Sequence, residues 1–172
     1  MVKLNPEGIL KALERYNKLG EEIERKDEEL RGKISEIVRE LNLEAEPISF
    51  ASAIRSYIGS HKTPNLEDFI KQLEGYIEKH IESFTEEEDE EDENVAEDIA
   101  RLERLKSRIG EVVKSKWTLI ENPLKEAIKL NNEIKELKRV KHELFGIDFG
   151  DVITLENLVT LVYKCLRYAM TE

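Results

Sequence analysis

Three arginines offer the clearest binding chemistry in this sequence. Arg101, Arg104 and Arg108 are separated by three and four residues, so on a helix they share one face. A row of guanidinium groups at this spacing suits a phosphate backbone, because each contact adds sequence-independent electrostatic attraction. We therefore treat these three as candidate nucleic-acid-binding residues. The ordinary alternative is a solvated helix face neutralised by acids such as Glu103 and Glu111.

The remaining reactive side chains form no recognisable catalytic or metal-binding pattern. His61, His80 and His142 follow neither a His-Glu-x-x-His nor a Glu-x-x-His spacing, which are the patterns of helical metal sites. Cys165 has apolar neighbours in the sequence, and such surroundings raise a thiol pKa and make the thiol unreactive. The sequence therefore predicts a non-enzyme with no catalytic residues, no metal site and no cofactor.

The negative charge is concentrated in one segment. The chain has 27 Lys and Arg against 38 Asp and Glu, a net charge of −11, and ten of the acids lie within residues 86–98. Residues 99–141 instead carry 12 basic and 6 acidic side chains, a net charge of +6. Like-charge repulsion predicts a mobile acidic loop over residues 85–94. Such a loop either covers the arginine face as a phosphate mimic or only improves solubility, and solubility is the simpler interpretation.

The overall composition is typical of a helical protein. Charged residues make up 38% of the chain and aromatic residues 6%, with 8 Gly and 4 Pro. Strands favour aromatic residues and tight turns favour Gly and Pro, so this composition disfavours a β fold. We predict an all-α fold: an antiparallel helical bundle of about six helices, with long coiled-coil-like helices and an acidic loop. One Gln, one Cys and two Met beside many Lys, Glu and Arg give a thermophile-like composition.

The helix signals divide a single predicted domain, residues 1–172, into successive elements. Asn5 and Pro6 are typical of a helix start, which predicts a long N-terminal helix over about residues 6–43. Ser49 and Asn65 are the expected N-caps of the second and third helices. The helical C-terminal part, residues 95–172, is expected to break at Asn122-Pro123 and to end in a helix capped by Thr154.

Apolar residues repeat every seven positions along the first helix, which is typical of long antiparallel packing. At about 38 residues this helix has a length of roughly 57 Å, whereas a compact domain of this size is about 40 Å across. The last helix is the most apolar segment of the chain. We therefore predict self-association or a protein partner, and the expected interface residues are Tyr16, Ile23, Leu30, Ile34, Ile37, Leu41, Leu158 and Val162.

Two functions follow from these features, and a helical enzyme whose site is assembled from residues distant in the sequence is a third, less favoured alternative. The first is a non-enzymatic helical interaction or assembly subunit that mediates protein–protein contacts. The alternative is a nucleic-acid-associated small subunit of a larger nucleoprotein complex that uses the basic helix face. Helical small subunits of CRISPR effector complexes are of this general kind, but the analogy is one of class alone. No segment approaches the ~18 consecutive apolar residues of a membrane span, so we expect a cytoplasmic protein without membrane contact.

Overall fold

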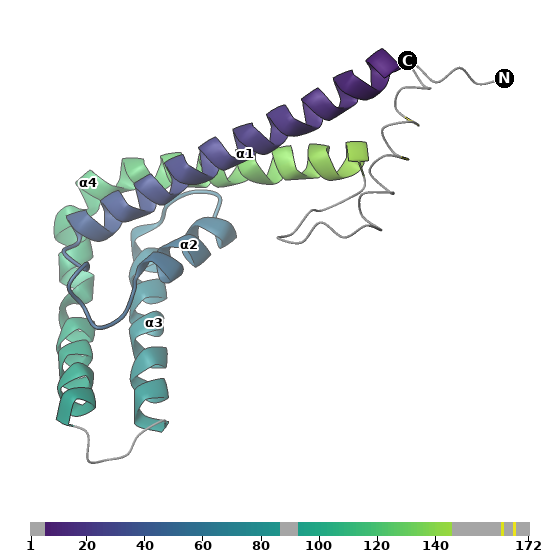
Figure 1. Cartoon of the computed structure of the whole chain (residues 1–172). Helices are drawn as coiled ribbons and strands as arrows, with labels where there is room; N and C mark the ends of the chain where they lie inside the picture. Colours follow the sequence, from purple (N-terminus) through teal and green to yellow (C-terminus); the bar gives the residue numbers. More distant parts are fainter. Residues whose placement is uncertain (1–5, 87–92, 146–162, 164–166, 168–172) are drawn as a thin grey trace. The chain divides into compact units, whose positions relative to one another are not determined.

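The computed structural model describes residues 6–86, 93–145, 163 and 167. Within these residues the chain forms α1 (Pro6–Glu40), α2 (Ala51–Ser60), α3 (Leu66–Glu86) and α4 (Glu93–Phe145), with no strand (Figure 1). The prediction of an all-α fold is confirmed for these residues, which form four helices where about six were expected for the whole chain. The chain divides into two compact units: unit 1 groups Met1–Glu28 with Asn132–Glu172, and unit 2 is Glu29–Asn131.

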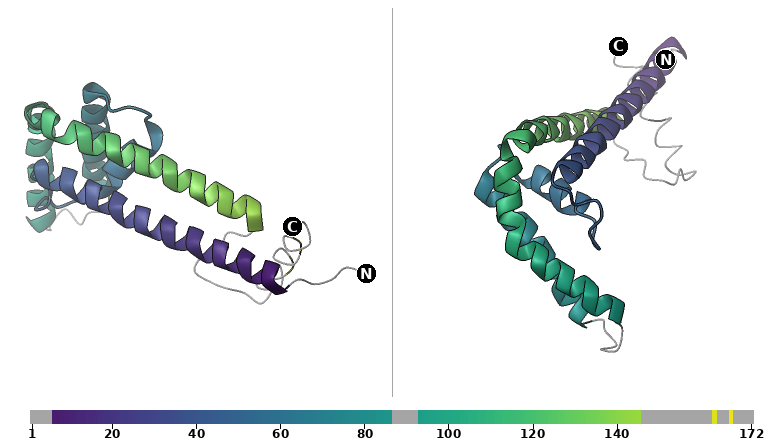
Figure 2. Two further views of the ribbon diagram at one scale, coloured as in Figure 1. Left: turned by 90° about the horizontal axis from the view of Figure 1, so that it is seen from above. Right: turned by 90° about the vertical axis from the view of Figure 1, so that its left-hand side faces the viewer.

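Unit 2 holds a continuous apolar core. The first part of α4 runs antiparallel to α3, as both the front and the side view show (Figures 1 and 2), and α2 packs on α3. The second half of α1 contributes its apolar stripe to the same unit. The largest fully buried side chains are Tyr57, Phe50, Phe69, Leu30, Ile37, Leu41, Leu43, Ile54, Ile58, Leu73 and Ile77.

The end of α1 is set by Asn42, which adopts a left-handed backbone with φ of 56°. The Asn42 amide donates to Arg39 O at 3.0 Å and the Leu43 amide to Val38 O at 3.0 Å. This is the Schellman arrangement, in which a left-handed residue lets the chain satisfy the last helical carbonyls. The helix therefore ends at Glu40, a little before the expected position near residue 43.

The two helix starts that follow differ in how they are capped. Asn65 caps α3 as predicted, because its Oδ1 accepts a hydrogen bond from the Asp68 amide at 3.1 Å, the usual N-cap geometry. The prediction for α2 was wrong: Phe50 takes the N-cap position and no side chain bonds there. Phe50 is 1% exposed, so apolar burial positions this helix start in place of a capping hydrogen bond.

The expected break at Pro123 does not end the helix. Pro123 lies inside α4, so the predicted fourth and fifth helices form one helix of 53 residues. A proline inside a helix removes one hydrogen bond and costs roughly 3 kcal/mol. Its neighbours Ile120, Leu124 and Ala127 are each 0% exposed, and burying a side chain of this size contributes about 1.5–3 kcal/mol. Packing on both sides of the proline therefore keeps the helix continuous.

In unit 1 the described residues are those of the first half of α1 and the last part of α4, together with Tyr163 and Arg167. The two helix segments run side by side (Figure 2). An ion pair joins Lys26 Nζ to Glu133 Oε2 at 2.7 Å. The Lys141 ammonium lies 4.4 Å from the centroid of the Tyr16 ring, which is within the range of a cation–π interaction.

Two predicted segments lie largely outside the described residues. Of the acidic loop predicted over residues 85–94, residues 87–92 are not described, but its two ends are helical because α3 reaches Glu86 and α4 begins at Glu93. The predicted helix after Thr154 also lies outside the described residues, apart from Tyr163 and Arg167, which are helical and exposed. None of the described helices combines the length and the apolar character needed to cross a membrane.

Candidate nucleic-acid interface

The candidate arginines are held on the outer face of α4 by the packing of its inner face. Leu102 and Ile109 are each 0% exposed, and Gly110 lies next to α3, because a Cβ there would be in van der Waals contact with Ile70 Cγ2 at 3.6 Å. Residues three and four apart share a helix face, so fixing the apolar face also fixes the direction of the arginine face. The buried stripe of α4 therefore positions the arginines within unit 2.

The three arginines surround one shallow pocket of about 450 Å³. Its lining residues are Arg101, Arg104, Ser107 and Arg108 from α4, together with Glu46 from the segment between α1 and α2. Three guanidinium groups and one carboxylate give this surface a local charge of +2. The pocket therefore brings together all three residues predicted from the sequence. It adds Ser107 and Glu46, which the sequence analysis missed.

Arg101 differs from the other two arginines because it already has partners within the chain. Its Nη2 donates a hydrogen bond to the backbone carbonyl of Ala45 at 3.1 Å and lies 3.8 Å from Glu46 Oε2. The Glu46 side chain is only 12% exposed, so this carboxylate is held next to the arginine. Arg101 therefore fastens the segment between α1 and α2 to α4.

Arg104 and Arg108 are exposed, and no described residue bonds to either guanidinium group. Each group keeps its full set of N–H donors, and a guanidinium fork suits the paired oxygens of a phosphate. Between them, the Ser107 hydroxyl donates to the Arg104 carbonyl at 2.7 Å, so its proton is already used within the helix. These two arginines supply the free positive charge of the site.

Much of the positive charge farther along α4 is neutralised locally. Arg139 is bound by both Glu136 and Glu143. Lys106 lies 3.4 Å from Glu78 of α3, and Lys125 lies 3.4 Å from Glu121. These basic side chains are therefore paired with acids. Arg104 and Arg108 differ from them because they are unpaired among the described residues and lie together at one pocket.

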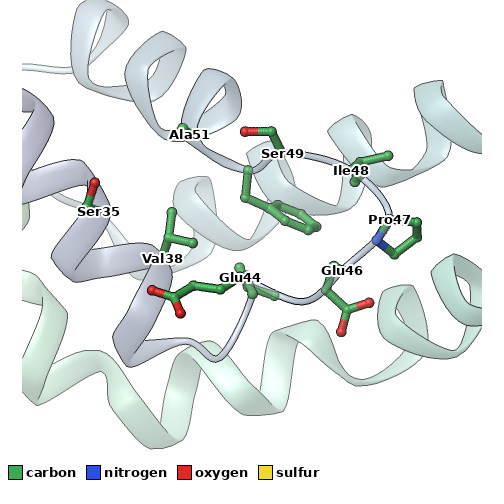
Figure 3. Close-up of a pocket in the computed structure, with 10 residues that line it drawn as sticks. Ser35, Val38, Glu44, Glu46, Pro47, Ile48, Ser49 and Ala51 are labelled. Atoms are coloured by element: carbon green, nitrogen blue, oxygen red, sulfur yellow. The ribbon is translucent and has the colours of Figure 1, made fainter.

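Glu46 also lines a second pocket, of about 310 Å³, which has the opposite character (Figure 3). It is lined by Glu44, Glu46, two serines and apolar side chains such as Val38 and Phe50, and by no basic residue. Figure 3 shows the Glu46 carboxylate pointing toward α4, which agrees with its proximity to Arg101. Two carboxylates repel phosphate, so this second pocket is a poor anion site.

The residues predicted as a protein interface are in three different situations. Leu30, Ile34, Ile37 and Leu41 are 0–3% exposed in unit 2, where the chain itself covers them. Tyr16 and Ile23 in unit 1 are half-buried. Leu158 and Val162 lie outside the described residues. Only Tyr16 and Ile23 are therefore described with part of their surface accessible to a partner.

The two buried or half-buried histidines of unit 2 pack on aromatic rings. His61 stacks on Tyr57 with ring centroids 4.0 Å apart, and its Nδ1 lies 3.0 Å from Tyr57 O. His80 meets the Tyr76 ring edge-on at 4.5 Å. Among the described residues, no three His, Cys, Asp or Glu side chains gather closely enough to hold a metal ion.

Comparison with known proteins assigns no family to this chain. No protein-family model, curated protein or solved structure matches it.

Proposed function

We propose that this protein is a non-enzymatic helical binding subunit that associates with nucleic acid through the arginine pocket of α4. The observation that carries the proposal is the pair Arg104 and Arg108, which are exposed, unpartnered within the described chain and placed around one pocket. Such groups contact phosphates and provide affinity without reading base sequence.

The structure also suggests different roles for the three arginines. Arg104 and Arg108 are the phosphate-binding residues, because their donors are free. Arg101 is a positioning residue, because it holds Ala45 and Glu46. Glu46 lowers the local charge of the pocket and weakens non-specific attraction, so we expect a weak, salt-sensitive site that depends on the two free arginines.

The test measures binding of a fluorescent DNA duplex by anisotropy over a series of salt concentrations. Variant Arg104→Gln/Arg108→Gln should reduce the slope of log affinity against log salt by about 1.8, since each phosphate contact to duplex DNA contributes about 0.9. The matched control is Arg15→Gln/Arg25→Gln, which removes two exposed arginines of α1 and should leave the slope unchanged. Equal losses in both variants, or no binding of the wild type at low salt, would reject the proposal.

Arg101 provides an independent arm of the same experiment. Arg101→Gln should lower the melting temperature, because it releases the segment between α1 and α2, whereas Arg104→Gln/Arg108→Gln should not. If instead all three substitutions reduce binding alone and leave the melting temperature unchanged, then Arg101 is a third phosphate contact and its positioning role is wrong.

A second function, protein–protein contact, is supported by unit 1. Its apolar stripe on α1 includes Leu13, Tyr16, Leu19 and Ile23, and all four are only half-buried. Burying apolar surface contributes about 25 cal/mol for each Å² removed from water. A partner that covers the exposed part of this stripe would therefore gain hydrophobic stabilisation. We propose that this stripe contacts a second copy or another protein. Light scattering should show a mass above the monomer that Ile23→Glu reduces, and a monomeric wild type at high concentration would reject self-association.

A further inference from the structure

A second groove in unit 2 lies between α2 and α3 and shares no residue with the arginine pocket. It has a volume of about 400 Å³, and α2 lies against α3 along it (Figure 1). The polar residues that line it are Ser52 and Ser56 from α2 and Lys71, Gln72 and Lys79 from α3. No carboxylate is among its lining residues. The groove therefore presents ammonium, amide and hydroxyl groups without an opposing negative charge.

The two acids between Lys71 and Lys79, Glu74 and Glu78, are directed toward α4. Glu78 Oε2 lies 3.4 Å from Lys106 Nζ of α4. Glu74 Oε1 lies 3.8 Å from the position that a Cβ on Gly110 of α4 would take. Both carboxylates of this stretch thus face α4, while the lysines of the same helix line the groove beside α2. This separation of charge leaves Lys71 and Lys79 without an acidic partner among the described residues.

Gly75 opens the groove midway between the two lysines. The residues Lys71, Gly75 and Lys79 follow one another at intervals of four, so they form a stripe along α3. Glycine inside a helix costs about 0.5–1 kcal/mol relative to alanine, and here no packing requires it, since a Cβ on Gly75 would meet nothing within 4 Å. The missing side chain leaves the space between the lysines empty.

The wall beside Gly75 is rigid. The Tyr76 hydroxyl donates a hydrogen bond to the Ser49 carbonyl at 2.5 Å, and the Tyr76 ring packs against Phe50 with centroids 5.7 Å apart. The Tyr76 hydroxyl is protonated at neutral pH, far below the ordinary tyrosine pKa of 10.0, and burial raises that pKa further. A pre-formed wall lowers the entropic cost of binding a small ligand.

We propose that this groove binds the diphosphate group of a small phosphorylated ligand. Lys71 and Lys79 lie about 12 Å apart along the helix axis, from a rise of 1.5 Å for each residue, so their long side chains can contact the two phosphates from opposite ends. Ser56 and Gln72 supply neutral donors between them. A volume of about 400 Å³ falls within the range of small-ligand sites, whereas a nucleic-acid strand needs an extended basic track. This inference does not depend on the arginine pocket.

The test is a titration of the full chain with inorganic pyrophosphate at constant ionic strength, followed by amide NMR. Saturable shifts are expected in residues 52–56 and 71–79, which include the Gly75 amide at the centre of the groove. Shifts centred on residues 101–108, or shifts that never saturate and are spread over all exposed lysines, would overturn the proposal.

Two pairs of variants distinguish specific pyrophosphate binding in the groove from non-specific attraction of pyrophosphate to positive charge. Gly75→Met fills the groove without meeting any atom near its Cβ, and Gly32→Met is its control, because Gly32 is also an open helical glycine but does not line the groove. Lys71→Gln/Lys79→Gln is matched by Lys114→Gln/Lys129→Gln, two exposed lysines of α4.

Each groove variant should raise the pyrophosphate dissociation constant about tenfold or more, a free-energy change of about 1.4 kcal/mol, while each control leaves it unchanged. Equal binding by Gly75→Met and Gly32→Met would overturn the proposal. A short single-stranded DNA serves as the other source of phosphate. If DNA shifts the groove residues and pyrophosphate does not, the small-ligand assignment is wrong and the groove belongs to a nucleic-acid surface.

Discussion

The two halves of α1 carry the same apolar repeat and yet differ in burial. In unit 1, Tyr16 and Ile23 are half-buried, whereas in unit 2 Leu30 and Ile37 are 1% and 0% exposed. In unit 2 the chain itself covers the stripe, whereas in unit 1 the stripe keeps part of its surface exposed. The last part of α4 lies beside α1 in unit 1 (Figure 2). Periodicity therefore sets which face of a helix is apolar, and tertiary packing sets how completely that face is covered.

The largest effect is expected from shortening the same side chain in each half. Ile37→Ala should reduce the free energy of unfolding by about 2–5 kcal/mol, because it leaves a cavity in a packed core. Ile23→Ala removes a half-buried side chain and should cost about 1 kcal/mol or less, in proportion to the smaller apolar area. Urea unfolding of both variants measures the difference. Equal costs would show that the two halves are buried alike in solution.

A smaller effect is expected from the tyrosine hydroxyls. Tyr57 is 0% exposed; its hydroxyl oxygen accepts from the Asn65 amide at 2.8 Å and donates to the Asn65 carbonyl at 3.3 Å. Tyr57→Phe removes the bond to the Asn65 amide, while the Asn65 carbonyl keeps its bond from the Phe69 amide, and should cost about 0.5–1.5 kcal/mol. Tyr16→Phe in unit 1 keeps the ring under Lys141 and should cost less. Thermal unfolding at neutral pH compares the two, and a larger loss for Tyr16→Phe would contradict the comparison.

The same tyrosine predicts sensitivity to alkali. Burial raises the pKa of Tyr57 above its ordinary value of 10.0, so the folded protein binds this proton more tightly than the unfolded chain. The stabilisation is complete at neutral pH and is lost as the pH rises above 10.0 through the folded pKa. Unfolding curves between neutral pH and pH 11 should therefore converge for wild type and Tyr57→Phe, and a constant gap would be inconsistent with a raised pKa.

The smallest effect concerns one ion pair in each unit. Lys26 and Glu133 of unit 1 are joined at 2.7 Å, and Lys33 and Glu126 of unit 2 at 2.6 Å, where the hydrogen bond to Glu126 raises the pKa of Lys33. Double-mutant cycles with Gln should give about 0.2–1 kcal/mol for each pair, reduced by salt. Lys26 is the more buried lysine, at 19% exposure against 33%, so its pair should be the less sensitive to salt. The opposite order of salt sensitivity would mean that the Lys26–Glu133 pair is the more exposed of the two in solution.

Local sequence signals determined a large part of this fold. The scarcity of strand-forming residues and the spacing of apolar residues predicted an all-α chain, and Asn65 was correctly predicted to cap α3 because an N-cap bond needs only residues three apart. The spacing of Arg101, Arg104 and Arg108 likewise predicted their common face, since helical periodicity alone places them together.

Tertiary packing decided what local signals could not. Pro123 is a helix breaker by local rules, but the buried residues around it keep α4 continuous. Three arginines on one helix face look equivalent in the sequence, and only the folded segment between α1 and α2 binds one of them, through Ala45 and Glu46. The groove between α2 and α3 joins residues from two helices and has no signature in either. Local patterns fix the direction of side chains around one helix, whereas burial and pairing depend on which other helices lie beside it.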